Sequence, residues 1–346
     1  MRTILGLRLL GTLVSLTLVT TLAAETTDDA NPPGLLHVAL PVVAGGQSAL
    51  ALPTAAPVLA SIRDTKVDPA DPAAAQDPLP QIREPPLPPA SLFDGRKILA
   101  FYGRPGSKSM GILGEYPKEE LAALLFAYAK LYDNANGGAG VIPAFYIVYG
   151  TCWPGGDLGY LRDSVVEEWV DYAARNGIMV ILDSQIGRFG VDDAIKRLLP
   201  WLSHPNVHLA LDPEWRTTDP MKTIGSVTAD ELNQAQAALS DWLAAHGDTS
   251  ERILVIHQFT AKMISDRNRV RADYPGVRLI HSSDGFGSPP LKKKTYAYNA
   301  LADNMPRKGF KLFMKTDVRG AGYDEPLLTP AEVIALDPSP EMIIYQ

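Results

Sequence analysis

Cysteine is almost absent from this chain of 346 residues, because Cys152 is the only one. A single cysteine excludes an internal disulfide and a cysteine-based zinc site. Basic residues do not outnumber acidic ones, and the formal net charge is −7. That is the wrong sign for a nucleic-acid-binding protein, and the one basic run, Lys292–Lys294, is typical of a solvated helix face.

Several cofactor-binding motifs are also missing. The six histidines form no His-x-His and no His-Glu-x-x-His pattern, which are typical of metal sites. There is no phosphate-binding loop, and the segment Gly103–Ser107 after the first predicted strand lacks the GxGxxG spacing. These absences argue against a doubly wound open sheet that binds a dinucleotide.

The N-terminus has the pattern of an export signal. Arg2 and Arg8 precede an apolar run over residues 9–22, and Ala23 and Ala24 follow it. We predict a signal peptide over residues 1–24, with an uncleaved anchor helix as the alternative. The run is shorter than the roughly 20 apolar residues of a membrane span. We therefore expect a secreted, periplasmic or cell-surface protein with no stable membrane insertion after cleavage.

A change of composition separates this segment from the rest of the chain. Residues 25–93 are rich in proline and alanine, which predicts a disordered, semi-rigid spacer. Residues 94–346 carry short apolar runs, mostly continuous, as buried parallel strands do. The predicted strands are Ile98–Gly103, Val141–Tyr149, Ile178–Asp183, Val207–Asp212, Ile253–Gln258, Val277–His281, Phe310–Lys315 and Met342–Tyr345.

Helical stretches with start signals lie between these strands. Three pairs of residues have the spacing of a capping box: Ser164 with Glu167, Thr228 with Glu231, and Thr329 with Glu332. The predicted helices are Lys118–Tyr132, Val165–Arg175, Asp192–Leu199, Glu231–His246, Lys262–Ala272, Leu291–Ala302 and Ala331–Leu336.

Eight strands that alternate with seven helices over about 250 residues predict a (β/α)8 TIM-type barrel. The last predicted strand reaches almost to Gln346. We therefore expect the eighth outer helix to be missing, and the linker or a partner to cover that side.

Catalytic residues of such barrels lie at the C-terminal ends of the strands and in the loops that follow. The candidate catalytic residues are Asp183, Asp212, Glu214 and Asp284. The candidate substrate-binding residues are Tyr102, Tyr149, Trp153, Gln185, Arg188, Trp215, His257, Gln258 and Lys315.

The sharpest local feature is the sequence Asp212-Pro213-Glu214. In an extended chain its two carboxylates share one face, and such a pair raises the pKa of one member. A raised carboxyl group is suited to act as a general acid near neutral pH. Alternatively, Asp212 begins a turn and Glu214 pairs with a nearby arginine such as Arg188.

This Asp-x-Glu pair resembles the catalytic signature of chitinase-like and muramidase-like glycoside hydrolases, which are (β/α)-barrels. The resemblance implies that Glu214 is the general acid and that Asp212 stabilises charge or orients the substrate. The chain departs from the chitinase pattern at Val207 and Ala210, where acidic residues are expected. The seventh predicted strand ends in Lys315, so the glutamate nucleophile of the large retaining clan is not implied.

The predicted folded region also resembles a family of exported bacterial (β/α)8-barrel proteins. The resemblance implies the barrel and export, and it implies no particular reaction. It is carried by the segments Phe101–Gly103, Ile181–Arg188, His208–Glu214, Ile256–Phe259 and Asp284–Gly287.

Three functions remain open at this point. The first is a glycan hydrolase that needs no cofactor. The second is a metal-dependent sugar isomerase or phosphodiesterase, in which Asp183, Glu214, His257 and Asp284 bind Mg, Mn or Zn. The third is a non-catalytic carbohydrate- or wall-binding domain. All three predict a carbohydrate or another small molecule as the ligand, and none predicts a nucleic acid.

Overall fold

The computed structural model describes residues 92–346. The predicted signal peptide, residues 1–24, and residues 25–91 of the predicted linker lie outside the described residues. Within residues 92–346, no helix is long and apolar enough to cross a membrane.

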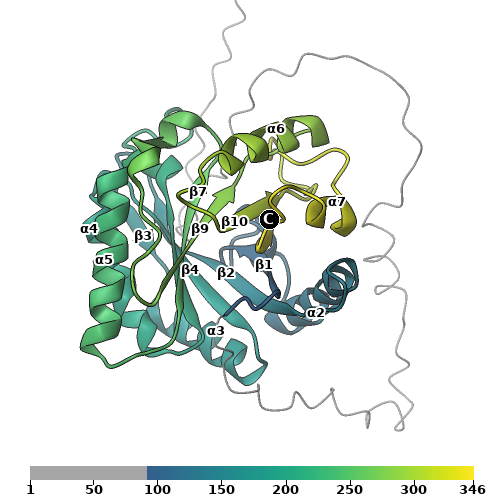
Figure 1. The fold of residues 1–346 in the computed structure, drawn as a ribbon, viewed down its shortest axis with the longest axis horizontal. Helices are drawn as coiled ribbons and strands as arrows, with labels where there is room; N and C mark the ends of the chain where they lie inside the picture. Colours follow the sequence, from purple (N-terminus) through teal and green to yellow (C-terminus); the bar gives the residue numbers. More distant parts are fainter. Residues whose placement is uncertain (1–91) are drawn as a thin grey trace, which may run out of the picture. The chain divides into compact units, whose positions relative to one another are not determined.

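Eight parallel strands within the described region close into a barrel, which confirms the predicted fold (Figure 1). Neighbouring strands pair in the order β1-β11-β10-β9-β7-β5-β4-β2, and β2 pairs back with β1 to close the ring. The barrel strands are β1 Lys97–Gly103, β2 Val141–Cys152, β4 Met179–Gln185, β5 Val207–Asp212, β7 Arg252–Gln258, β9 Val277–Ser283, β10 Lys308–Leu312 and β11 Met342–Tyr345.

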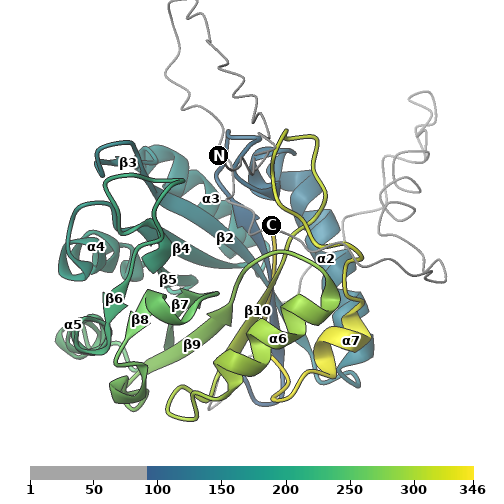
Figure 2. The ribbon, with the colours of Figure 1, turned by 90° about the horizontal axis from the view of Figure 1, so that it is seen from above.

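Helices surround the strands (Figures 1 and 2). The capping boxes of Thr228 with Glu231 and of Thr329 with Glu332 are present. The box of Ser164 with Glu167 was wrong, because the helix begins at Asp163, two residues before the predicted start, and its N-cap Arg162 makes no side-chain cap. The helices are α2 Lys118–Ala135, α3 Asp163–Arg175, α4 Val191–Leu198, α5 Ala229–Ala245, α6 Pro289–Ala300 and α7 Pro330–Ile334.

Short elements decorate the barrel. The strand β3, Leu158–Tyr160, pairs antiparallel with the end of β2. Strands β6, Val227–Thr228, and β8, Ile264–Ser265, form a separate two-stranded sheet. The 3₁₀ turns are Ile112–Gly114, Leu199–Ser203, Pro213–Trp215, Ala261–Met263 and Arg267–Arg269.

The predicted helix Lys262–Ala272 was wrong. The segment instead contains two 3₁₀ turns and β8, and Asp266 adopts the left-handed conformation with φ 52°, which interrupts a helix. Side chains of α5 replace the lost helical hydrogen bonds, since Asn233 donates to the Arg269 carbonyl and Gln236 donates to the Arg271 carbonyl. Side chains of α5 therefore satisfy carbonyl groups of the extended backbone in this segment.

The outer face of β11 is covered by α2. Tyr345 points outward, its hydroxyl lies 2.8 Å from that of Tyr132, and its ring packs edge-on against Tyr128. Helix α2 also contacts α7 directly (Figure 2). In the structure, these helices cover the side for which we expected the linker or a partner.

Two apolar clusters occupy the two sides of the strands. One lies between the strands and the helices, and it includes Leu99, Phe101 and Leu182. The other fills the barrel interior, because alternate residues of each strand point inward, such as Ile98 and Ala100 of β1.

Leu92 and Phe93 pack against the interior cluster at its N-terminal end. Phe93 is buried, and the Arg307 guanidinium lies 4.5 Å from the centre of its ring. The Leu92 amide donates to Glu251. Both residues were assigned to the linker by composition, and the structure places them with the barrel.

We predict that a fragment of residues 92–346 folds cooperatively, and that Phe93→Ala in it lowers the free energy of unfolding by about 3–5 kcal/mol, the usual cost of removing a buried phenylalanine. The control is Phe126→Ala, which removes the same group from a 38% exposed position on α2. Urea unfolding measures both. An insoluble fragment, or equal costs at the two positions, would contradict this boundary.

Candidate active site at the C-terminal end of the barrel

The inward positions of the strands change from apolar to polar at their C-terminal ends. In β1 the side chains that point inward are those of Ile98, Ala100 and, at the C-terminal end, Tyr102. Strand register sets neighbours side by side, since Tyr102 pairs with Tyr146 of β2 and His257 of β7 pairs with Ser282 of β9. The inward polar residues are Tyr102, Tyr146, Asp183, Asp212, His257, Ser282, Asp284 and Lys311, and all are buried.

His257 is the centre of this group. Its Nδ1 lies 2.6 Å from Oδ2 of Asp284, and its Nε2 lies 2.6 Å from the Tyr146 hydroxyl and 3.6 Å from Oδ2 of Asp183. Burial alone would lower the pKa of His257, but the Asp284 and Asp183 carboxylates outweigh burial and raise it to about 9. The ring is therefore an imidazolium at neutral pH, and it donates to Asp284 and to the Tyr146 oxygen.

Lys311 supplies a second cation. Its Nζ lies 3.4 Å from Oδ2 of Asp284 and 3.6 Å from the centre of the Tyr102 ring. The Tyr102 hydroxyl in turn donates to Oδ2 of Asp183 over 3.1 Å. Carboxylates, cations and tyrosines thus form one connected network.

Asp284 is the most strongly ionised carboxyl group of the network. Burial alone would raise its pKa, but His257 and Lys311 hold it below its ordinary range. Ser282 also donates to its Oδ1 over 2.8 Å. Asp183 behaves differently, because burial raises its pKa and, among the described residues, its Oδ1 has no hydrogen-bond partner.

Asp212 and Glu214 lie where β5 ends and the turn Pro213–Trp215 begins. Oδ1 of Asp212 accepts from the Glu214 amide, so Asp212 caps this turn as one alternative predicted. Burial raises the pKa of Asp212 to about 7. Burial, and next the Asp212 carboxylate, raise the pKa of Glu214 to about 8. At pH 7 Glu214 is therefore mostly protonated and Asp212 is partly protonated.

Charge balance predicts how many carboxyl groups of the network stay protonated. In the described part of the chain, four carboxyl groups, those of Asp183, Asp212, Glu214 and Asp284, share this end of the barrel with the cations His257 and Lys311. Two cations balance two carboxylates, and an unbalanced buried carboxylate is costly. Two carboxyl groups are therefore expected to stay protonated.

Several predicted substrate-binding residues lie elsewhere. The Tyr149 ring faces the helices, where its hydroxyl accepts from Arg197. Gln258 also faces outward and lies 2.8 Å from Nε2 of His281. Arg188 pairs with Asp157 over 2.7 Å, so it is not the partner of Glu214 that one alternative predicted.

Four further predicted residues have local roles in the structure. Gln185 accepts from the Cys152 amide over 2.5 Å. Trp153 lies in the turn between β2 and β3, with its ring against Gly159. Trp215 is buried in the turn after β5. Lys315 lies beyond β10, which ends at Leu312, and its exposed side chain lies over the Tyr323 ring.

Tyr146 and Lys311 belong to the network but were not among the predicted site residues. The prediction used residues at or just after the ends of the apolar runs, whereas the inward phase of each strand decides which side chain reaches the network. In β10, Phe310 packs outward on Tyr296, so Lys311 points inward. Lys292 was misjudged as well, because it is buried and not solvated.

The described residues include no group of three or more His, Cys, Asp and Glu side chains arranged to hold a metal ion. Both ring nitrogens of His257 are engaged by protein groups. Burial raises the pKa of the Cys152 thiol to about 11, which keeps it protonated at neutral pH.

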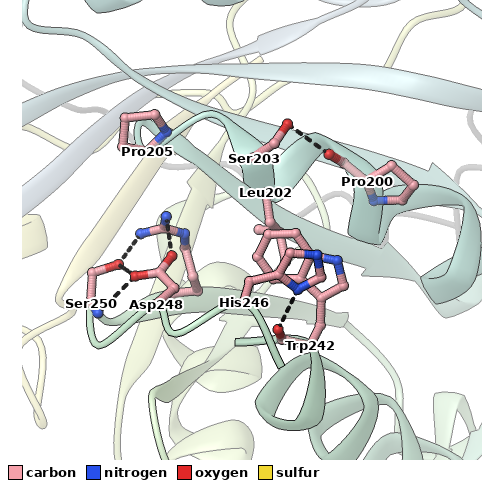
Figure 3. Close-up of a pocket in the computed structure, with 9 residues that line it drawn as sticks. Pro200, Leu202, Ser203, Pro205, Trp242, His246, Asp248 and Ser250 are labelled. Atoms are coloured by element: carbon pink, nitrogen blue, oxygen red, sulfur yellow. Dashed lines mark hydrogen bonds and ion pairs between the residues drawn. The ribbon is translucent and has the colours of Figure 1, made fainter. Parts of the chain in front are cut away.

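A cavity of about 840 Å³ lies away from this network, near the start of β7 (Figure 3). Trp242 stacks on His246 at 3.9 Å between ring centres, and Arg252 is neutralised by Asp248 over 2.7 Å. The cavity shares no residue with the network.

No protein-family model matches the chain, and no curated protein matches it. Among solved structures the chain is similar to oxaloacetate acetylhydrolase in complex with oxalate, with 14% identity and a TM-score of 0.42 over 72% of this chain and 75% of that one. It is similar to an endo-beta-1,4-glucanase from Xanthomonas axonopodis pv. citri, with 12% identity and a TM-score of 0.42 over 72% and 88%. It is also similar to a family 18 chitinase from Crocus vernus, with 12% identity and a TM-score of 0.35 over 72% and 92%. Likenesses this distant carry no argument about activity, and the barrel rests on the strand pairing of the chain itself.

The raised pKa of Glu214 predicts a pH-dependent stability. A carboxyl group whose folded pKa is about 8 binds its proton more tightly in the folded state, so its contribution to stability is lost as pH rises from about 4.5 to 8. Glu214→Gln removes this loss. We expect the variant to gain about 2–4 °C in Tm over the unchanged protein at pH 8, roughly 1 kcal/mol, and to gain little at pH 5.

Thermal unfolding across pH 5–8 measures this difference. The control is Asp192→Asn, which removes an exposed carboxylate paired with Lys196 on α4. Parallel pH profiles for Glu214→Gln and the unchanged protein would mean that Glu214 titrates in its ordinary range.

Proposed function

We propose that the protein is a glycoside-hydrolase-like enzyme that uses carboxylate general acid/base chemistry at the C-terminal end of its barrel. The observation that carries the proposal is that carboxyl groups of one network have pKa values shifted in opposite directions. Asp284 is held ionised, while the pKa of Asp212 is raised to about 7 and that of Glu214 to about 8. Pairs of groups displaced in this way provide an acid and a base at the same pH.

Glu214 is the proposed general acid. It is half-buried, whereas Asp183, Asp212 and Asp284 are buried, so it is the least buried residue of the four. In the proposed step, Glu214 gives its proton to the glycosidic oxygen as the bond to the anomeric carbon breaks. A water molecule adds to that carbon and loses a proton to a carboxylate.

Asp183, Asp212 or Asp284 is the proposed base or stabiliser. An oxocarbenium-like transition state carries positive charge, which an ionised carboxylate stabilises. Asp284 is ionised, and its contacts with His257 and Lys311 fix its position. Asp212 is the closest in sequence to the acid and caps the turn that carries it.

The proposed substrate is a glycan outside the cytoplasm. The predicted signal peptide and the proline-rich spacer support an exported protein that acts at a distance from its point of export. A metal-dependent sugar isomerase or phosphodiesterase is less well supported, because His257 has both nitrogens engaged by Asp284 and Tyr146.

We predict that Glu214→Gln lowers kcat on the order of 100-fold or more with little change in KM, because a general acid acts only in the transition state. The assay is hydrolysis of a polysaccharide panel by the purified full chain, with and without a chelator. Asp192→Asn is the matched surface control and should retain full activity.

Full activity of Glu214→Gln would remove this residue as the acid. Loss of turnover on adding the chelator would favour the metal-dependent enzyme. Glycan binding without turnover by the unchanged protein would favour the non-catalytic binding domain, which needs no protonated acid beside an ionised base.

A further inference from the structure

A buried lysine lies beside the part of the network that Asp284 and Lys311 form. Lys292 belongs to α6 and is 3% exposed. Its Nζ donates to the main-chain oxygen of Gly285 over 2.6 Å and to that of Lys311. The first of these carbonyls follows Asp284 directly, and the second belongs to the network lysine itself.

Asp324 completes this arrangement. Its Oδ2 lies 3.3 Å from Nζ of Lys292 and accepts from the Phe313 amide over 3.0 Å. Its Oδ1 accepts from the Gly287 amide over 2.9 Å. The Lys292–Asp324 pair therefore connects α6, the loop after β9, the end of β10 and the segment that carries Asp324.

Such a pair is costly to bury. Removing two charges from water opposes their mutual attraction, and well-packed apolar residues often replace a buried ion pair without loss of stability. Apolar packing is available here, because the rings of Phe310 and Phe313 lie 4.9 Å and 5.0 Å from Nζ of Lys292. Apolar side chains cannot supply the directed hydrogen bonds that Lys292 donates to the carbonyls of Gly285 and Lys311.

We propose that Lys292 and Asp324 are positioning residues that hold Asp284 against His257 and hold Lys311 over Tyr102. Neither residue touches the proposed reacting atoms, and both act through the backbone of the residues that do. Only the kinetic consequence rests on the proposed function. The effect on His257 does not, because it concerns a contact within the free protein.

Two variants, Lys292→Met and Asp324→Asn, test this proposal. In Lys292→Met, the loss of charge and the loss of positioning have opposite effects on the pKa of His257. Lys292→Met removes a positive charge, so a through-space effect alone would raise the pKa of His257. Loosening of Asp284 would lower that pKa, because the Asp284 carboxylate is the largest influence that raises it. Asp324→Asn removes a negative charge, so charge and position both lower the pKa there.

The experiment follows the imidazole signals of the full chain by NMR across pH, with His257→Gln used to assign the resonance among six histidines. We expect the pKa of His257 to fall by about one unit or more in both variants, towards its ordinary value of about 6.5. The control is Lys293→Met, because this neighbour on α6 is exposed and its variant should leave the pKa unchanged. A rise or no change in Lys292→Met would overturn the proposal.

A second variant keeps the test decisive if Lys292→Met does not fold. Lys292→Met/Asp324→Leu replaces the whole pair by apolar side chains, which should preserve folding. The pKa of His257 should still fall in it, and an unchanged pKa would overturn the proposal.

Kinetics separate this proposal from the proposed function. Where a glycan is hydrolysed, Lys292→Met should lower kcat about 10- to 100-fold with KM nearly unchanged, as misplacement of catalytic groups does. If no glycan is hydrolysed, a fall in the pKa of His257 still supports positioning. If Glu214→Gln abolishes turnover while Lys292→Met has an unchanged pKa at His257, the proposed function stands and positioning is overturned.

Discussion

The hydrogen-bonded ion pair between His257 and Asp284, 2.6 Å long, organises the C-terminal end of this barrel. It keeps the imidazole charged inside the protein, where burial alone would neutralise it. The charged ring then attracts Asp183 and orients the Tyr146 hydroxyl. If His257 were neutral, Lys311 would be the only network cation among the described residues, and it would face four carboxyl groups. The protonation of Asp212 and Glu214 follows from the same balance.

The barrel explains how so many polar groups share one place. Each strand presents alternate residues to the interior, and register sets the last inward residues side by side. Apolar residues fill the rest of the interior, and Leu92 and Phe93 close its N-terminal end. The low-dielectric surroundings strengthen every charge interaction in the network. In these surroundings a carboxyl group stays ionised only beside a cation or hydrogen-bond donors, and the pKa values of the four groups therefore separate.

The sequence predicted the fold well because the strands are continuous apolar runs and two of the capping boxes have their full pattern. It predicted Asp183, Asp212, His257 and Asp284 as candidates because each stands at or just after a strand end. It failed where inward phase matters, and so it chose Tyr149 and Lys315 instead of Tyr146 and Lys311. It also failed at 262–272, since the bonds from Asn233 and Gln236 that satisfy the extended backbone come from a distant helix. Lys292 was misjudged for a similar reason, because its partners lie on other segments.

The most direct test of this account is a ¹³C NMR titration of the side-chain carboxyl groups in the full chain, with Asp212→Asn and Glu214→Gln used for assignment. The account predicts that these two groups titrate as a coupled pair near pH 7 and 8, while Asp284 stays ionised far below that range. If all the carboxyl groups of the network titrate below about pH 5, near their ordinary values, the proposed balance between two cations and four carboxyl groups is wrong.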